Sequence, residues 1–298
     1  MNKHHIRGVY MLDEDYPPLL MELSDAPVLL YVLGEGSLNP PHALAVVGTR
    51  KASAYGLNFT KQLIADLAAY YPDMSVVSGL AYGIDAAGHN AAMEHGLETL
   101  AVVAHGLDMV YPAAHRELAR RIVHAGGAIV SEYPTGTTPY QRNFLERNRI
   151  VAGLCEATFV AESEVRGGAM STANQAFQNN RDVMALPGRA GDTLSSGCNH
   201  LIRSQKAQLI TCAADVVQLT GWAPYAMQSA PRQRNLFPEL SGPAAQIYSL
   251  MRHESAALTI DVLHQRTGIS IKDLMPVLTE MEFDGIITRL PGSRYQLG

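Results

Sequence analysis

The chain has 298 residues and a formal net charge of −5, with 47% hydrophobic and 17% charged residues. These values predict a compact protein with one large and one small domain, and exclude a disordered chain and capture of nucleic acid by overall positive charge. The lack of a long apolar run or signal peptide, with three isolated cysteines, predicts a cytoplasmic protein without membrane spans, disulfides or a cysteine zinc site.

The predicted elements begin with a lead-in segment, residues 1–42. Residues 43–221 then alternate short apolar runs with amphipathic stretches. The strand candidates are Ala43–Val47, Met74–Ser78, Thr99–Ala104, Ala128–Ser131, Ala157–Glu162, Asp182–Pro187 and Gln208–Ile210. The helix candidates between them include Tyr55–Tyr71, Ile84–His95 and Ala113–Ala125. Apolar strands separated by helices predict an α/β fold whose doubly wound, mostly parallel sheet is covered on both faces.

The loop after the first of these strands has the composition of an anion site. Gly48 permits a tight turn, and Ser53 is a candidate N-cap of the helix that follows. Arg50 and Lys51 stand beside the helix N-terminus, where the helix dipole favours negative charge.

The loop after the second strand, from Ser78 to Asp85, carries glycines at Gly79 and Gly83. Two glycines allow close backbone approach and an arrangement of amides that can hold a phosphate. The two loops do not form a dinucleotide fingerprint, because the GxGxxG spacing and an acidic residue after the second strand are both missing.

The segment Pro139–Ile150 concentrates positive charge in an acidic chain. It holds Arg142, Arg147 and Arg149, with only one acidic residue among them, and the aromatic Phe144. Guanidinium groups follow phosphates while an aromatic ring stacks bases, so the segment favours binding of single-stranded nucleic acid. The alternative is a solvated amphipathic helix whose arginines pair with neighbouring acids.

Residues 222–241 are rich in proline and polar residues and read as a linker. Residues 242–298 show a winged-helix-like pattern of three helices and two strands: Pro243–His253, Thr259–Thr267, Ser270–Phe283, Gly285–Leu290 and Ser293–Leu297. Pro231–Gly298 contains seven basic and seven acidic residues. This balance does not suit a major groove and favours a protein-interaction or regulatory role.

Signs of catalysis are weak. Asp85 and His89 lie four residues apart on a predicted helix, a spacing that more often marks a structural contact than an acid–base pair. The histidines lack ligand-like spacing, so we expect neither a metal nor a cofactor. The alternative function is nucleotide hydrolysis of the nucleoside-monophosphate phosphoribohydrolase type. The stretch Pro187–Asp192 lacks the second glycine and the threonine of that class's phosphate loop.

Several of these motifs follow one another with the spacing of a known family. They are GTRKASAYG, SGLAYGIDAAGHNAA, LDMVYPAAHREL, SEYPTGTTPYQRNFLERNRIVAGL, ESEVRGGAMSTANQAF, RDVMALPGRAGD and GCNHLI. Over roughly Tyr16–Gln218 the chain resembles the DNA-processing protein A (DprA/Smf) family. The resemblance implies a Rossmann-like core that binds single-stranded DNA as a homodimer. It also implies protection of incoming DNA and loading of RecA recombinase in natural transformation, without catalytic activity.

The resemblance also implies individual DNA contacts. Arg50 would meet phosphate, with Ser53 and the loop containing Ser78, Gly79 and Gly83 beside it. Phe144 would stack a base, Arg147, Asn148 and Arg149 would line the groove, and Arg166 matches a basic position of the family. By helical spacing, one of the arginines is a candidate for a buried clamp instead. Two departures stand out: Tyr82 replaces a common arginine, and Leu145 replaces a proline and should let the helix continue.

Overall fold

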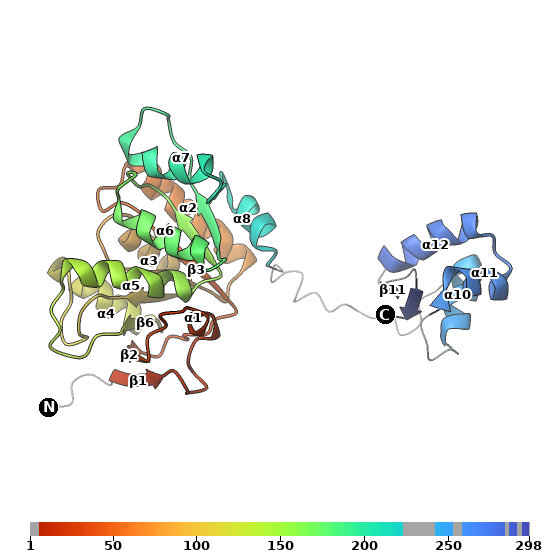
Figure 1. The fold of residues 1–298 in the computed structure, drawn as a ribbon, viewed down its shortest axis with the longest axis horizontal. Helices are drawn as coiled ribbons and strands as arrows, with labels where there is room; N and C mark the ends of the chain where they lie inside the picture. Colours follow the sequence, from red (N-terminus) through yellow and green to blue (C-terminus); the bar gives the residue numbers. More distant parts are fainter. Residues whose placement is uncertain (1–5, 223–241, 253–257, 284–285, 291–293, 298) are drawn as a thin grey trace. The chain divides into compact units, whose positions relative to one another are not determined.

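The structure is a computed structural model that describes residues 6–222, 242–252, 258–283, 286–290 and 294–297. The chain divides into two compact units, Met1–Pro231 and Arg232–Gly298. Figure 1 shows each unit with its own layers of helices and strands. Among the described residues, no helix combines the length and apolar character needed to cross a bilayer.

Within residues 6–222, nine strands form one sheet in the order β1-β2-β6-β5-β4-β3-β7-β8-β9. The strands are β1 Ile6–Tyr10, β2 Leu29–Gly34, β3 His42–Val47, β4 Met74–Ser78, β5 Glu98–Val102, β6 Ala128–Ser131, β7 Ala157–Val160, β8 Asp182–Ala185 and β9 Gln208–Leu209. All pairings from β6 to β9 are parallel. The predicted Rossmann-like, mostly parallel sheet is therefore confirmed.

The lead-in belongs to this sheet, a feature the sequence analysis did not predict. Tyr31–Gly34 of β2 pairs antiparallel with Ala128–Ser131 of β6, and β1 pairs antiparallel with β2. Burial alternates along β2 from Leu29 to Val32, as expected for a strand near a sheet edge with one face covered. Such a strand lacks the continuous apolar run that marks the central strands, so it is harder to recognise in sequence.

Helices cover both faces of the sheet. The helices are α1 Pro18–Met21, α2 Ala54–Tyr70, α3 Ile84–Glu94, α4 Arg116–His124, α5 Gln141–Gly153, α6 Gly168–Gln178, α7 Ser196–Arg203 and α8 Ala213–Thr220, with short 3-10 turns at Ala113–His115 and Thr193–Ser195. Side chains of β3 alternate between two cores. Ala45 and Val47 pack with α1, α5, α6 and α7, whereas Leu44 and Val46 pack with α2, α3 and α8.

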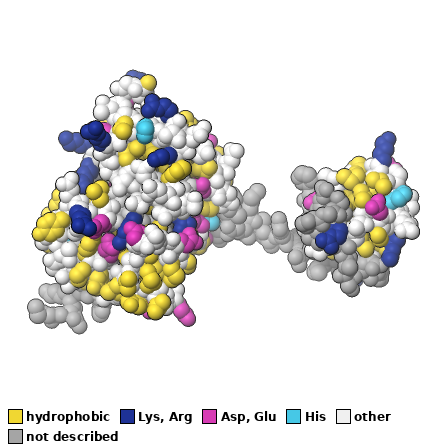
Figure 2. All heavy atoms as spheres, in the orientation of Figure 1, with side chains coloured by type: hydrophobic (Ala, Val, Ile, Leu, Met, Phe, Trp, Pro, Cys, Tyr) yellow, Lys and Arg dark blue, Asp and Glu magenta, His cyan; other side chains and the backbone are white. Residues whose placement is uncertain are grey.

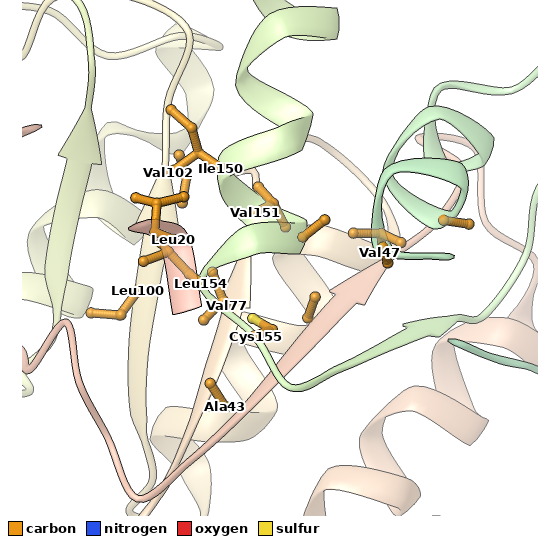
Figure 3. Close-up of a cluster of buried hydrophobic side chains, with 14 of the residues drawn as sticks. Leu20, Ala43, Val47, Val77, Leu100, Val102, Ile150, Val151, Leu154 and Cys155 are labelled. Carbon is orange, nitrogen blue, oxygen red and sulfur yellow. The ribbon is translucent and has the colours of Figure 1, made fainter. Parts of the chain in front are cut away.

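The lead-in is held by the first of these cores. Leu20 of α1 lies beside Ile150 and Leu154 at the end of α5 (Figure 3) and is fully buried. Burying a leucine side chain stabilises a fold by about 1.5–3 kcal/mol, so α1 anchors the lead-in to α5. This contact fixes one side of the helix that carries the basic segment.

The second unit is the predicted winged helix. Its elements are α10 Gly242–Arg252, β10 Leu258–Thr259, α11 Ile260–Thr267, α12 Ile271–Phe283, β11 Ile287–Leu290 and β12 Arg294–Leu297. The strands form a small antiparallel sheet in the order β10-β12-β11. Ile247, Leu263 and Leu278 belong to its separate apolar core. Of the predicted linker, only Trp222 lies within the described residues, where it stacks on His42.

Candidate nucleic-acid interface

A pocket of about 840 Å³ lies at the carboxyl ends of β3, β4 and β7. The chain runs from β3 outward through β4, β5 and β6, and then returns to the other side of β3 with β7 and β8. Ligands of doubly wound sheets bind in the crevice at this reversal of strand order. We call the cavity the switch-point pocket; it is lined by residues from the loops after β3, β4 and β7 and from α5 and α6, among them Gly48, Arg50, Lys51, Gly79, Phe144, Arg147, Asn148, Arg166 and Gly168.

Exposed cations dominate the rim of the pocket. Arg50, Lys51 and Arg166 line it and are exposed, against the single exposed acid Glu164. Within the described residues, no carboxylate forms an ion pair with any of these three cations. Elsewhere basic and acidic side chains lie interspersed on the surface (Figure 2), consistent with the net charge of −5. The rim of the pocket therefore carries a local excess of positive charge on an acidic protein.

The N-terminus of α6 adds positive character to the pocket. Gly167, Gly168 and Ala169 line the pocket where α6 begins. Gly167 is the N-cap residue of α6, and among the described residues no side chain caps the first amides of the helix. The first amides of a helix lack intrahelical acceptors and carry partial positive charge, which favours negatively charged ligands. Asn148 is buried beside them and donates its amide to the Gly168 carbonyl over 3.4 Å.

Phe144 provides an aromatic surface inside the pocket. The ring is half-buried, and the Arg50 guanidinium carbon lies 5.5 Å from its centroid. Tyr111, from the loop after β5, packs against it with ring centroids 5.7 Å apart and planes inclined by 50°. The helix continues through the exposed Leu145, as predicted, so Phe144 projects from a regular turn of α5. A positive charge and an aromatic face thus occupy one site.

Arg147 lines the pocket, but it departs from the predicted open groove contact because its side chain is buried. Its side chain is only 5% exposed, and Nη1 donates to the Val102 carbonyl over 2.5 Å. A Cβ on Gly79 would lie 2.1 Å from Nη1, so the guanidinium passes directly beneath the loop after β4. Arg147 is the buried clamp that helical spacing suggested, and it forms the floor of the pocket.

A buried carboxylate lies near this clamp. Asp85, at the start of α3, accepts a hydrogen bond from the Ala81 amide over 3.2 Å. Burial raises the pKa of Asp85, an effect that the positive charge of Arg147 opposes. Burial likewise lowers the pKa of Arg147, which nevertheless stays protonated as arginines do in proteins. The two groups hold the loop from Gly79 to Gly83 in place.

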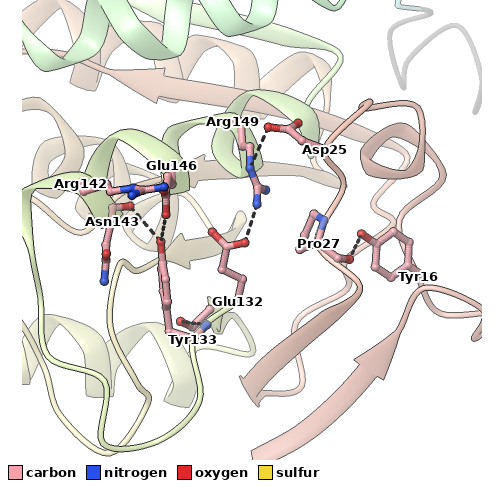
Figure 4. Close-up of polar contacts among 10 residues, drawn as sticks. Tyr16, Asp25, Pro27, Glu132, Tyr133, Arg142, Asn143, Glu146 and Arg149 are labelled. Carbon is pink, nitrogen blue, oxygen red and sulfur yellow. Dashed lines mark hydrogen bonds and ion pairs between the residues drawn. The ribbon is translucent and has the colours of Figure 1, made fainter.

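Arg149 also departs from the prediction, because its guanidinium is already paired. It contacts Glu132 over 2.5 Å and Asp25 over 3.2 Å (Figure 4). Arg142 similarly pairs with Glu146 one turn along α5. Residues two apart on an α-helix lie about 200° apart around its axis, so Arg147 and Arg149 face opposite sides. Arg149 fastens α5 to the lead-in and does not line the pocket.

Ser53 and Ser78, which were expected beside a DNA phosphate, both have structural roles. Ser53 is the N-cap of α2, as predicted, and accepts from the Gly56 amide. Its hydroxyl and amide both bond the buried Glu162 carboxylate, so the hydroxyl is engaged. Ser78 is fully buried and donates to the Val46 carbonyl over 2.6 Å. Neither serine is among the residues that line the pocket.

Gly83 allows the loop after β4 to pack closely against the loop after β3. Its φ is +75°, and a Cβ there would lie 2.3 Å from the Thr49 carbonyl oxygen. Only glycine combines this backbone with such a close approach at low cost. Gly83 and the tightly packed Gly48 therefore bring the loop after β3 against the loop after β4, a structural role. Gly48 and Gly79 also line the pocket, whereas Gly83 does not.

The residues considered for catalysis do not form an acid–base pair. The Nδ1 atom of His89 lies 2.7 Å from the Thr99 hydroxyl, whereas Asp85 bonds the loop after β4. Pro187–Asp192, the stretch compared with a hydrolase phosphate loop, does not line the pocket. Gly188 in that stretch is held by Asn199. The geometry thus concentrates cationic and aromatic groups without an evident acid–base pair at the site.

Tyr111 is one of the pocket residues that the sequence analysis did not predict. It lies in the motif LDMVYPAAHREL, but nothing in that stretch marks the tyrosine as part of a binding site. Its place beside Phe144 arises only because the loop after β5 meets α5 in the folded protein.

A sequence profile described as DNA recombination-mediator protein A matches residues 7–221, and a DprA winged helix domain profile matches residues 228–293. The chain is 34% identical over 287 residues to Protein Smf of Escherichia coli, covering 95% of this chain and 75% of that protein.

Two solved structures are similar in both sequence and fold. The structure of DNA processing protein A from Streptococcus pneumoniae aligns with a TM-score of 0.66 and 40% identity, covering 72% of this chain and 74% of that one. A Helicobacter pylori DNA processing protein A structure, described for its single-stranded DNA binding mode, aligns with a TM-score of 0.65 and 28% identity. That alignment covers 73% of this chain and 96% of the other.

Proposed function

Because the chain belongs to the DNA recombination-mediator protein A (DprA/Smf) family, we propose that it binds single-stranded DNA in the switch-point pocket. One observation carries the proposal. Three exposed cations, Arg50, Lys51 and Arg166, line the same pocket as the aromatic ring of Phe144 in a chain whose net charge is −5. The single-stranded DNA binding named for the Helicobacter pylori relative supports single-strand binding by this chain.

The shape of the site favours an unpaired strand. Phosphates follow the exposed cations and the amides at the start of α6, while a base lies on Phe144. The Phe144 ring is half-buried inside the pocket, so a base must leave its neighbours to reach it. Bases of a duplex are stacked and paired, and exposing one costs a few kcal/mol. Duplex DNA should therefore bind more weakly than a single strand.

The biological role that we propose follows the family. The protein would protect incoming single-stranded DNA and load RecA recombinase onto it in the cytoplasm during natural transformation, acting as a homodimer without catalysis. The description of the family as a recombination mediator supports this role.

The winged helix is proposed to contact protein and not DNA. The exposed side of α12 carries Lys272 against Asp273, Glu280 and Glu282, a charge balance that repels phosphate. Ile271 on the same helix is also exposed, as suits contact with an apolar partner. Crosslinks from bound DNA to α12 would contradict this assignment.

Replacing Arg50 by Ala tests the proposed function. Three free cations predict a log–log salt slope of about −2 for single-stranded DNA, and the variant should shift it to about −1.4. Affinity should fall by about 1.5–3 kcal/mol for every sequence, because a phosphate contact carries no base information. Stimulation of RecA on the same strands should fall in parallel. The measurement is fluorescence anisotropy at several salt concentrations.

The matched control is Arg120→Ala, which removes an exposed arginine of α4 outside the pocket. It should leave both affinity and salt slope unchanged. Equal losses in the two variants would show that binding depends on overall charge, and the proposed site would be wrong.

A further inference from the structure

A second, smaller hollow adjoins the switch-point pocket on the side away from α6. Its volume is about 30 Å³, and it shares Arg50, Tyr111 and Phe144 with the larger cavity. A space of this size holds about one water molecule and cannot enclose a base. Three aromatic rings, those of Tyr82, Tyr111 and Phe144, line it beside Pro112 and the residues Arg50, Gly79 and Ala81. We call Tyr82 and Tyr111 the tyrosine pair.

Tyr82 is held in a defined position although it is exposed. Its ring lies 4.6 Å from the ring of His115, with planes inclined by 67°. The Nδ1 atom of His115 is in turn 2.8 Å from the Leu80 carbonyl, two residues before Tyr82. The Tyr82 side chain is 46% exposed, so about half of its surface remains open to a ligand. A ring fixed in this way loses little conformational entropy when a partner stacks on it.

Tyr111 is fixed from its backbone. Its amide donates to Nε2 of the buried His105 over 3.2 Å, and Nδ1 of the same ring lies 2.9 Å from the Gly106 carbonyl. These contacts require a neutral His105 with its proton on Nδ1. The Tyr111 side chain is 45% exposed and packs against Phe144 on one side.

We propose that the tyrosine pair is a second base-stacking surface, which takes the base adjacent to the one on Phe144. The proposal rests on the proposed function and extends it from one base to two consecutive unpaired bases. Arg50, shared by both cavities, would hold the phosphate between those bases. Every base offers a flat π-face, so this surface accepts any sequence but requires bases.

Base stacking would be the function of Tyr82 at this position. An exposed aromatic ring that His115 holds in place is suited to stack on a flat partner. A cation there would add a phosphate contact and make binding more dependent on salt. Tyrosine instead adds a contact with bases that salt screens little.

The test compares wild type with Tyr82→Ala on two strands of equal length, one fully base-bearing and one containing a run of abasic sites. On the base-bearing strand, the substitution should weaken binding about fivefold to hundredfold. On the abasic strand it should have no effect, because phosphate contacts are untouched. Tyr82→Phe should retain wild-type affinity for both strands.

Tyr10→Ala is the matched control, since Tyr10 is also 46% exposed but lies on β1, outside both cavities. It should bind both strands like wild type. Equal weakening of Tyr82→Ala on the two strands, or no weakening on either, would overturn the inference while leaving single-strand binding intact. Failure of the proposed function would differ, because wild type itself would then not bind single-stranded DNA.

Discussion

Replacing Arg147 by Ala is expected to lower the free energy of unfolding by about 3–5 kcal/mol, the usual cost of leaving a buried charge without a compensating charge nearby. Arg147 and Asp85 are only 5% and 7% exposed, and the charge of Arg147 is the one that opposes the effect of burial on the Asp85 carboxylate. The substitution also removes the donor to the Val102 carbonyl and opens space beneath Gly79. The loop after β4 should lose its support.

Chemical denaturation monitored by circular dichroism measures this effect. Arg50→Ala is the control, an exposed arginine of the same pocket, and its unfolding free energy should stay within about 0.5 kcal/mol of wild type. Removing both charges in Arg147→Met with Asp85→Asn should recover much of the loss, because no buried charge is then left alone. An Arg147→Ala protein as stable as Arg50→Ala would contradict the assignment of Arg147 as a structural clamp.

Acidification is expected to destabilise the protein through His89. Burial, with smaller contributions from His115 and Arg147, lowers the pKa of His89 to about 3. The Nδ1 atom of His89 lies 2.7 Å from the Thr99 hydroxyl, and that hydroxyl donates its own proton to the Val76 carbonyl. Nε2 is buried and lacks a hydrogen-bond partner within the described residues, so a proton there would bring an unpaired charge.

The sign of the pH dependence follows from these pKa values. An unfolded histidine takes up a proton below about pH 6.5, whereas folded His89 stays neutral until about pH 3. Protons therefore favour the unfolded state. The stability from neutral His89 is complete above pH 6.5 and declines as pH falls toward 3. The decline is about 1.4 kcal/mol per pH unit, or about 2 kcal/mol at pH 5.

Comparing wild type with His89→Gln isolates this contribution, because other titrating groups are common to both proteins. The stability difference between them should be constant above pH 7 and shift by about 2 kcal/mol in favour of the variant at pH 5. A difference that does not change between pH 8 and pH 5 would show that His89 is not buried in its neutral form.

The central fold was predictable because its strands are continuous apolar runs. Ala43–Val47 and Asp182–Pro187 were recognised by that pattern and appear as β3 and β8 with small shifts at their ends. The antiparallel edge was harder, because β1 and β2 are only partly buried. The place of β2 in the sheet depends on its pairing with β6, which is distant in sequence, and β1 joins the sheet only through β2.

The candidate site was predicted in outline but not in its division of roles. Arg50 and Phe144 lie together as expected for a charged and stacking site. The different roles of Arg147 and Arg149 depend on how α5 is rotated about its axis, which the sequence does not give. Arg147 faces the sheet, whereas Arg149 faces Glu132. Tyr111 was not predicted as a site residue because Phe144, the ring against which it packs, is distant in sequence.

Photo-crosslinking tests most directly whether the switch-point pocket holds a single strand. An oligonucleotide containing iodouracil would be bound to the full chain and irradiated, and crosslinked peptides would be identified by mass spectrometry. We predict crosslinks at Phe144 and Tyr111, whose rings face the pocket. Crosslinks confined to α12 or to the lead-in, with none in the pocket, would contradict the account.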